Sequence, residues 1–465
     1  MSLNEGQKRA SLPKEDEVSD IGNVSARRRS AIFANLITTC VALAMMSTAM
    51  NTTLAPLVGD LGVSVALGQW VTSGYALALA VVMPLTAYLV TRFSSRSLYL
   101  FAVGSYALAS LCCAAAPSFA LLMAGRVAQA CMNGVIANLT QVSILSLFGP
   151  GSRGKAMGWF GLSQGAAVVA GPVLGGFLAD AFGWRAVFFG VALICAASFS
   201  AAQLTLVNLL PVRNRPFDVV SFILSVLAFG GLSLGLGSVV SSGLSPLVLG
   251  ALLVGAGGTG LFAARQLASA EPFLDVRLLG MPVFSLATGC SAALYACSMA
   301  SSAVLPLQVQ MGLGQSAAWA GLVVLPGAVV LALVNPLSGS AFDRFGIRPL
   351  CLGGGLCVLA ANLATCIPGV QGSLMLLTAV NMVRCLGFGL LQMPLVTWAN
   401  SCLGQAELPH ASALLTALRN VAGAVGVAVG ASLFQLAGGS AAFAVMAGLS
   451  LLLFLPVAVR SAKAG

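Results

Sequence analysis

The sequence contains very little charge. Asp, Glu, Lys and Arg together make up 7% of its 465 residues, against roughly 25% in an ordinary soluble protein. Hydrophobic residues make up 58%, and the mean hydropathy is +0.98. So little polar surface cannot keep this much apolar mass in water, which excludes most soluble enzymes, a nucleic-acid binder and a disordered chain. A helical membrane protein with many spans remains.

Residues that bind metals or form catalytic pairs are also scarce. His410 is the one histidine, and none of the twelve cysteines has the paired spacing of a zinc site. We therefore expect buried free thiols, no metal, no cofactor and no enzymatic centre.

Long apolar runs follow residue 30, whereas residues 1–30 are polar and hold five of the twelve acids. This stretch predicts a disordered cytoplasmic tail. A helix needs roughly 20 apolar residues to cross a bilayer. We predict fourteen spans, at 31–57, 70–91, 97–116, 119–148, 156–180, 186–210, 218–240, 246–264, 283–307, 317–342, 349–367, 373–400, 411–436 and 440–459.

The basic residues indicate the orientation. If the N-terminus is cytoplasmic, eighteen of the 22 Lys and Arg fall in cytoplasmic segments and one, Arg185, falls outside. The other three, Arg126, Arg384 and Arg419, lie within spans. Because cytoplasmic loops are enriched in Lys and Arg, we predict a plasma or inner membrane protein with both termini in the cytoplasm. The basic residues that give the net charge of +10 then fix the topology of the chain in the lipid bilayer, on its cytoplasmic face. They do not indicate a nucleic-acid partner.

An internal repeat divides the chain. Residues 84–96 (PLTAYLVTRFSSR) match 336–348 (PLSGSAFDRFGIR) at Pro, Leu, Arg, Phe and Arg. Two unrelated basic turns are the alternative, but a repeat with the same topology is typical of halves related by an axis along the membrane normal. We predict a tail at 1–30, six-helix bundles at 31–210 and 283–465, and two additional helices with linkers at 211–282.

Polar residues within the predicted spans form two stripes. The stripe on the fourth span consists of Arg126, Gln129, Asn133 and Gln141. The stripe on the twelfth consists of Asn381, Arg384 and Gln392. A charge at the membrane centre costs about 2.5–3.5 kcal/mol, so it suggests a function. Two stripes in corresponding spans predict one shared aqueous cavity. Hydrogen bonds that hold helices together are the alternative.

The fifth predicted span is rich in glycine. It contains AGPVLGG at 170–176. Glycine lets two backbones approach closely, and proline bends a helix. We predict a hinge or seal between the halves here, with simple tight packing as the alternative.

These features resemble the major facilitator superfamily, in its fourteen-span drug/proton antiporter branch (the EmrB/QacA type). Residues 69–96 resemble the lincomycin-exporter subgroup, and GRVAQ at 125–129 resembles the fourth-span arginine motif. The segment 170–176 is similar to the antiporter motif, and 411–426 to the thirteenth span. The resemblance covers essentially everything after the tail. It implies a major facilitator fold, with two pseudo-symmetric six-helix bundles plus two extra central helices.

The resemblance also implies gating residues. They come from both repeat copies, the antiporter motif and the thirteenth span: Arg92, Arg96, Gly171, Pro172, Gly175, Gly176, Gly339, Asp343, Arg344, Arg348 and Arg419. The first repeat copy departs from the family's motif, because Thr91 stands where the motif has an aspartate.

Substrate-binding candidates follow from the four helices that the family brings to its centre. They are Met46, Met50, Asn51, Arg126, Gln129, Asn133, Tyr295, Met299, Arg384, Gln392 and Trp398. Methionine and aromatic side chains form an adaptable apolar surface, although ordinary packing is the alternative for the methionines. Two arginines and no acid favour a small amphipathic molecule that is neutral or anionic. Removal of Arg384 should then impair transport of an anion more than of a neutral compound.

We therefore predict an efflux transporter for amphipathic organic compounds, of multidrug or antibiotic type, that works by alternating access as a monomer. The family's first-span acid is replaced by Met46, and no carboxylate lies in the middle of a span. A buried acid is what tunes a pKa for proton exchange, so we expect weak dependence on a proton gradient. The alternatives are an uncoupled facilitator or exporter of one anionic metabolite or lipid, and a membrane sensor without transport.

Overall fold

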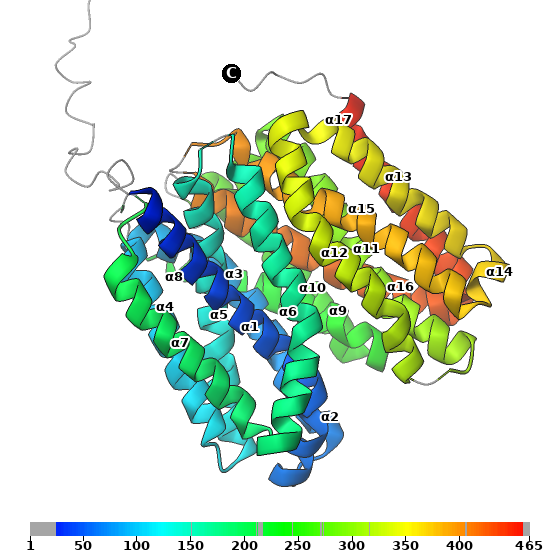
Figure 1. The fold of residues 1–465 in the computed structure, drawn as a ribbon, viewed down its shortest axis with the longest axis horizontal. Coiled ribbons are helices and arrows are strands. Elements are labelled where there is room, and N and C mark those ends of the chain that lie inside the picture. The colour runs from blue at the N-terminus through cyan, green and yellow to red at the C-terminus, as the bar shows by residue number, and fades with distance from the viewer. Residues whose placement is uncertain are drawn as a thin grey trace, which may run out of the picture.

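The computed structural model describes residues 25–149, 151–210, 212, 217–243, 245–269, 272, 274–315, 317–404 and 407–458. Within these ranges every regular element is a helix, and the long helices form two groups side by side (Figure 1). The predicted all-helical fold is therefore confirmed. Most of the predicted tail lies outside the described residues.

Six long helices make up the first group: α1 (Ala26–Leu61), α3 (Trp70–Arg92), α4 (Ser95–Ala114), α5 (Phe119–Leu147), α6 (Arg153–Phe182) and α7 (Arg185–Thr205). The second group consists of α11 (Pro282–Leu307) with η5 (Gln308–Gly312), α12 (Ala317–Phe345), α13 (Ile347–Thr365), α15 (Leu374–Ser401) and α16 (Leu408–Ser450). Between them lies a hairpin of α8 (Val219–Ser225), η3 (Val226–Gly230), α9 (Gly231–Ser242) and α10 (Pro246–Ala268). Short helices complete the chain: α2 (Val65–Gly68), η4 (Val276–Gly280), α14 (Pro368–Gln371), η6 (Leu451–Phe454) and α17 (Leu455–Ala458).

Serine residues mark the starts of several long helices. Ser94, Ser118, Ser245 and Ser373 each accept a hydrogen bond from the backbone N–H three residues later. Such a cap satisfies one of the amide groups that a helix start leaves free. Gly62 ends α1 with a left-handed φ of 63°, which glycine adopts without steric cost. Local capping therefore explains why these helices begin and end close to the predicted span limits.

Helix α16 reverses direction at Gly438, whose φ is 80°. Gly430, before the bend, packs on Ala300 of α11. Met446, after it, accepts a hydrogen bond from the Cys297 thiol of the same helix. Sixteen residues of a straight helix would cover roughly 24 Å, so the second limb (439–450) returns along α11 antiparallel to the first (408–437).

Twelve helices in the described part of the chain are long and apolar enough to cross a membrane. Helix α16 counts once among them although it has two limbs, and α6, with 30 residues, is not among them. The predicted count of fourteen spans therefore stays a prediction.

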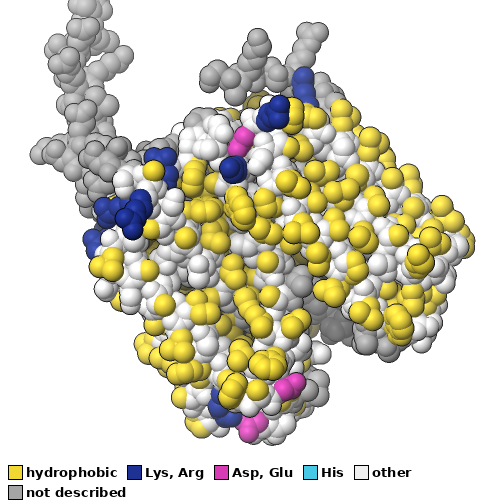
Figure 2. Space-filling model, in the orientation of Figure 1, with side chains coloured by type: hydrophobic (Ala, Val, Ile, Leu, Met, Phe, Trp, Pro, Cys, Tyr) yellow, Lys and Arg dark blue, Asp and Glu magenta, His cyan; other side chains and the backbone are white. Residues whose placement is uncertain are grey.

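Basic side chains gather at one end of the molecule, while the sides are largely apolar (Figure 2). At this end Arg28 of α1 donates to the Thr205 carbonyl at 2.8 Å, and Arg96 of α4 donates to the Gln203 carbonyl at 2.7 Å. These bonds tie the starts of α1 and α4 to the end of α7. We call this the basic end.

The opposite end has its own polar cluster. Asp60 of α1 accepts hydrogen bonds from Arg185 and, at 3.2 Å, from the Trp184 indole. Arg185 also donates to the Ala116 carbonyl at 3.1 Å. The hydrogen bond from Arg185 holds the pKa of Asp60 below its ordinary value of 3.8. Asp60 therefore stays ionised at neutral pH.

Candidate functional site

The two groups of helices meet most closely where α6 packs on α12. A Cβ atom added to Gly158 would lie 2.6 Å from the Asn335 carbonyl oxygen, and one added to Gly165 would lie 3.1 Å from Ala332. Gly339 of α12 is in turn packed on the backbone of Gly154. Backbones this close require glycine. The half of α6 nearest the basic end therefore forms a tight seal against the other group.

The other half of α6 packs within its own group. Gly171 lies against Met45 and Thr48 of α1, and Gly175 lies against Ala49. Gly176 lies beside them and is half-buried. The side chain of Pro172 is outside the described residues, although its backbone is helical. The glycine motif predicted to seal the halves thus packs mainly on α1, and the seal lies earlier in the same helix.

Asp343 reinforces the seal. Its Oδ1 accepts a hydrogen bond from the Gly154 N–H at 2.8 Å, and its Oδ2 accepts one from the Lys155 N–H at 2.7 Å. Both amides belong to the first turn of α6, where the helix dipole favours a negative charge. A carboxylate of the second group therefore caps a helix of the first and joins the two groups at the basic end.

A cavity of about 540 Å³ lies between α3, α9, α11 and α16. This volume falls in the range of roughly 300–1,000 Å³ that is typical of small-molecule sites. The described lining residues are uncharged: Gln69, Trp70, Ser73, Ala76, Leu77, Leu79, Ala80, Ser233, Leu234, Gly237, Ser238, Tyr295, Met299, Asn420, Gly423, Ala424 and Val427. This surface combines amide, hydroxyl, aromatic and apolar groups, so it suits an uncharged amphipathic molecule.

Two predicted substrate-binding residues, Tyr295 and Met299, line this cavity. Both pack on Gly423 of α16. The guanidinium of Arg419 lies 4.8 Å from the centre of the Tyr295 ring. Arg419 therefore supports a cavity wall from behind and does not itself line the cavity.

Arg126 lies elsewhere, inside the first group. It donates to the Val71 carbonyl at 3.2 Å and to Gln129 at 2.9 Å, and its guanidinium lies 4.2 Å from the Tyr75 ring centre. Gln129 donates onward to Ser110 at 2.8 Å. Arg126 is 1% exposed, so it joins α3, α4 and α5 and is closed off from the cavity.

Arg384 is equally buried in the second group. Its Nη2 donates to Thr365 at 2.5 Å and to the Ala361 carbonyl at 3.5 Å, and its guanidinium lies 4.7 Å from the Phe443 ring centre. The expectation that the two arginine-bearing faces meet across one aqueous space is therefore corrected. The hydrogen bonds that each of these buried guanidinium groups does make stay within its own group.

The other candidates whose side chains are described also lie off this cavity. Met46 and Met50 are fully buried in the core of the first group. Asn133 donates to the Tyr75 hydroxyl at 2.7 Å. Trp398 packs against both hydrophobic cores. Gln392 is half-buried on α15, and the Asn51 side chain is outside the described residues.

Comparison with known proteins decides the family. The chain matches the Major Facilitator Superfamily over residues 37–426. It belongs to this family. It is 33% identical over 383 residues to an uncharacterised MFS-type transporter, YhcA, of Bacillus subtilis (strain 168), which covers 82% of this chain and 72% of that one.

Two further comparisons agree with this membership. The lincomycin resistance protein LmrB of Listeria monocytogenes is 31% identical over 383 residues, which is 82% of this chain and 81% of that one. The crystal structure of the human organic anion transporter MFSD10 superimposes with a TM-score of 0.66 at 18% identity, over 93% of this chain and 99% of that one. The predicted family and the major facilitator fold are both confirmed.

In this major facilitator the other predicted gating residues lie around the basic end. Arg92 and Arg344 lie over the rings of Phe93 and Phe345, at 5.8 and 5.0 Å from the ring centres. Arg348 is half-buried near the start of α13. These residues surround the seal, and their gating role stays a prediction.

Several lining residues give little signal in the sequence. Gln69, Ser73 and Asn420 are uncharged, and Ser233 and Ser238 belong to the additional helices, outside the four central helices of the family. A search for charges in spans passes over all of them. Asn420 follows Arg419 directly, so the neighbouring polar pair was the one available signal.

Proposed function

We propose that this major facilitator exports neutral amphipathic organic compounds, including antibiotics, by alternating access. The observation that carries the proposal is an uncharged cavity between the two groups of helices, next to a basic end that α6, α12 and Asp343 close. The cavity extends from the middle of α16 to the start of α3 at the opposite end. The conformation is thus the one that releases a substrate away from the basic end.

The similarity to a lincomycin resistance protein supports an antibiotic-type substrate. The described lining provides no charged partner for an anion or a cation. An unpaired charge is costly inside a membrane, so we narrow the expected substrates to neutral compounds. The chain acts as a monomer in the inner membrane, with the basic end and both termini in the cytoplasm.

The direct test is transport by purified protein in liposomes, using matched neutral, anionic and cationic derivatives of one amphipathic scaffold. We expect the neutral derivative to move fastest. Transport of the anionic derivative alone would replace the proposal with the specific anion exporter. Binding without transport of any derivative would favour a sensor.

Proton coupling is expected to be weak. The described lining holds no carboxylate, and the first-span position of the family's acid is the buried Met46. Asp60 stays ionised because Arg185 lowers its pKa. The transport rate should therefore change by less than about twofold when an ionophore removes an imposed pH gradient. A twofold change corresponds to about 0.5 kcal/mol, which is the size of a minor effect. Abolition of transport by the ionophore would reject this part of the proposal.

A further inference from the structure

One wall of the cavity comes from outside the two repeated halves. Ser233, Leu234, Gly237 and Ser238 of α9 line it together with α3, α11 and α16. Helix α9 belongs to the segment between the halves, and it packs directly on α16. The additional hairpin therefore contributes surface to the candidate site as well as connecting the two bundles along the chain.

The position of α9 is fixed by close packing on α10. A Cβ atom on Gly231 would lie 2.7 Å from the Gly255 backbone nitrogen, and one on Gly255 would lie 2.5 Å from the Leu232 nitrogen. One turn away, a Cβ on Gly258 would lie 2.8 Å from the Ala228 nitrogen. The two helices thus touch backbone to backbone, which leaves α9 little freedom to move away from the cavity.

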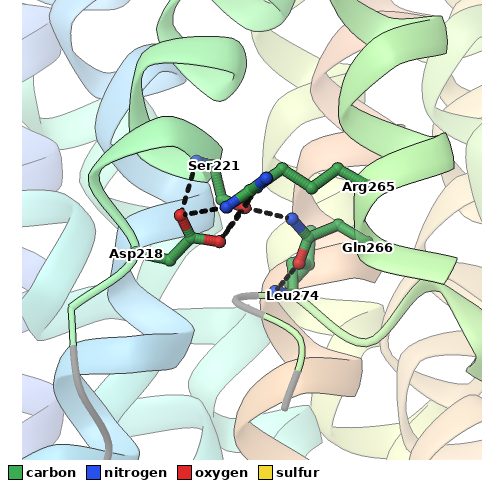
Figure 3. A network of polar contacts seen from close by, with 5 residues as sticks. All are labelled: Asp218, Ser221, Arg265, Gln266 and Leu274. Carbon is green, nitrogen blue, oxygen red and sulfur yellow. Dashed lines mark hydrogen bonds and ion pairs between the residues drawn. The ribbon is translucent and has the colours of Figure 1, made fainter. Parts of the chain in front are cut away.

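A polar network holds the same hairpin at the basic end (Figure 3). Asp218, just before α8, accepts hydrogen bonds from Arg265 of α10 at 3.0 and 3.1 Å and from the Ser221 N–H at 3.1 Å. Gln266, which is fully buried, donates to the Ser221 hydroxyl at 2.7 Å and accepts from the Leu274 N–H at 3.1 Å. The start of α8, the end of α10 and the linker that follows are therefore joined as one unit.

Gly237 is a point of this wall with open space beside it. It lines the cavity, and a Cβ atom added to it would meet nothing within 4 Å. A larger side chain at Gly237 would therefore start in open space beside the cavity, where a bound molecule would lie. Gly257 of α10 likewise has open space around its Cβ position, but it does not line the cavity.

We propose that α9 is a specificity-determining wall, which sets the largest neutral amphipathic compound that the cavity accepts. The proposal rests on the proposed export function. It assigns to the additional helices a role in substrate selection, with Gly237 as the residue that limits size and Ser233 as a source of polar contacts on the same wall.

The test compares Gly237→Leu with Gly257→Leu in liposomes that contain the full-length protein, using a small and a large neutral substrate of one chemical series. Filling the cavity should lower transport of the large compound about tenfold. Transport of the small compound should stay within about twofold of wild type. Gly257→Leu, the matched control on the same hairpin, should leave both unchanged.

Three outcomes would overturn the inference: unchanged transport of the large compound by Gly237→Leu, equal losses for both compounds, or the same losses in Gly257→Leu. Failure of the wild-type protein to transport either compound would instead reject the export function.

If Gly237→Leu does not fold, Gly237→Cys provides the readout. A neutral maleimide should label it above the wild-type cysteine background, the large substrate should slow that labelling, and labelling of Gly257→Cys should be unaffected by substrate. Labelling of Gly237→Cys that ignores the substrate also overturns the inference.

Discussion

The two halves of this transporter repeat one motif at the basic end but use it differently. In the second half Asp343 reaches across and caps α6 through two backbone amides. In the first half Thr91 occupies the equivalent position, and its hydroxyl donates to the Ala87 and Tyr88 carbonyls of its own helix. One copy of the motif therefore forms hydrogen bonds between the two halves, whereas the other forms hydrogen bonds only within its own helix.

The buried arginines show the opposite asymmetry. Arg126 of the first half has acceptors for Nε and Nη1 and an aromatic face beneath it. Arg384 of the second half bonds through Nη2 alone, and its Nε and Nη1 have no hydrogen-bond partner among the described residues. Equivalent positions in a repeat therefore need not share a role. The first half holds its arginine more firmly, and the second half supplies the latch.

The largest expected effect separates the two arginines. Arg126→Met should lower the free energy of unfolding by roughly 3 kcal/mol, because it removes two hydrogen bonds of a buried charged group. Arg384→Met should cost at least about 1 kcal/mol less, because part of that guanidinium is already unsatisfied. Thermal unfolding in detergent checks both variants. Equal losses of unfolding free energy in the two variants would show that the two halves hold their arginines equally firmly.

The same pair tests the earlier expectation about substrate charge. Because Arg384 is buried away from the cavity, Arg384→Met should reduce transport of neutral and anionic compounds in the same proportion, once each rate is corrected for the amount of folded protein. A selective loss for the anion would restore Arg384 to the substrate path.

Asp343→Ala should weaken the closed basic end by about 1–3 kcal/mol, since two charge-assisted hydrogen bonds to α6 are lost. The equilibrium between conformers would then shift roughly 5- to 150-fold towards opening at this end. Reactivity of a cysteine placed at the basic end of α6 measures the shift. Asp275→Ala is the matched control, because Asp275 accepts its hydrogen bond from the backbone N–H of Arg277, two residues along the chain. A shift of equal size in both variants would argue against a specific latch.

Thr91→Asp should have a smaller effect of opposite sign. Helices α3 and α16 pack antiparallel beside the cavity, so the end of α3 and the start of α16 lie at the same end of the molecule. A carboxylate near a helix N-terminus contributes about 0.3–1 kcal/mol. In the same cysteine assay, the double variant Thr91→Asp/Asp343→Ala should therefore shift the equilibrium back towards the closed basic end by roughly two- to fivefold, relative to Asp343→Ala alone. No recovery would show that the first copy of the motif cannot form a latch.

The smallest effect concerns the hairpin between the halves. The hydrogen bonds from Arg265 lower the pKa of Asp218 from 3.8 to about 2. A depressed carboxyl pKa gives stability that is complete above the unfolded value and is lost as the pH falls through the folded value. The difference in melting temperature between wild type and Asp218→Asn should thus be constant above about pH 4 and shrink between pH 4 and 2. A difference that does not change over this interval would contradict the ion pair.

The helices were predictable from the sequence because the bilayer imposes a minimum apolar length. The reversal of α16 at Gly438 falls in the gap predicted between 411–436 and 440–459. The end of α9 at Ser242 and the start of α10 at Pro246 likewise fit the predicted break between 240 and 246. The limits of these helices depend on the hydropathy and the glycine positions of the local sequence. They can therefore be predicted without knowing how the helices pack.

The cavity was not predictable in the same way. Intramembrane arginines suggested the lining, yet the hydrogen-bond acceptors of Arg126 and Arg384 all lie within each arginine's own group. Which neighbour satisfies a buried charge depends on helix packing, and the sequence of one span does not contain that information. Asn420 and Ser233, which do line the cavity, cost little to place in a membrane and therefore give a weak signal.

The divided packing of α6 has a mechanical consequence. Its first half grips α12 through Gly158 and Gly165, while its second half grips α1 through Gly171 and Gly175. If the basic end opens, as the proposed alternating access requires, the contacts with α12 have to separate, whereas the contacts with α1 stay within the first group. The change in packing partner then falls between Gly165 and Gly171. Bulky residues before this point should weaken the contacts with α12 and so favour the conformer that is open at the basic end. Bulky residues after it should weaken the contacts with α1 and so destabilise both conformers.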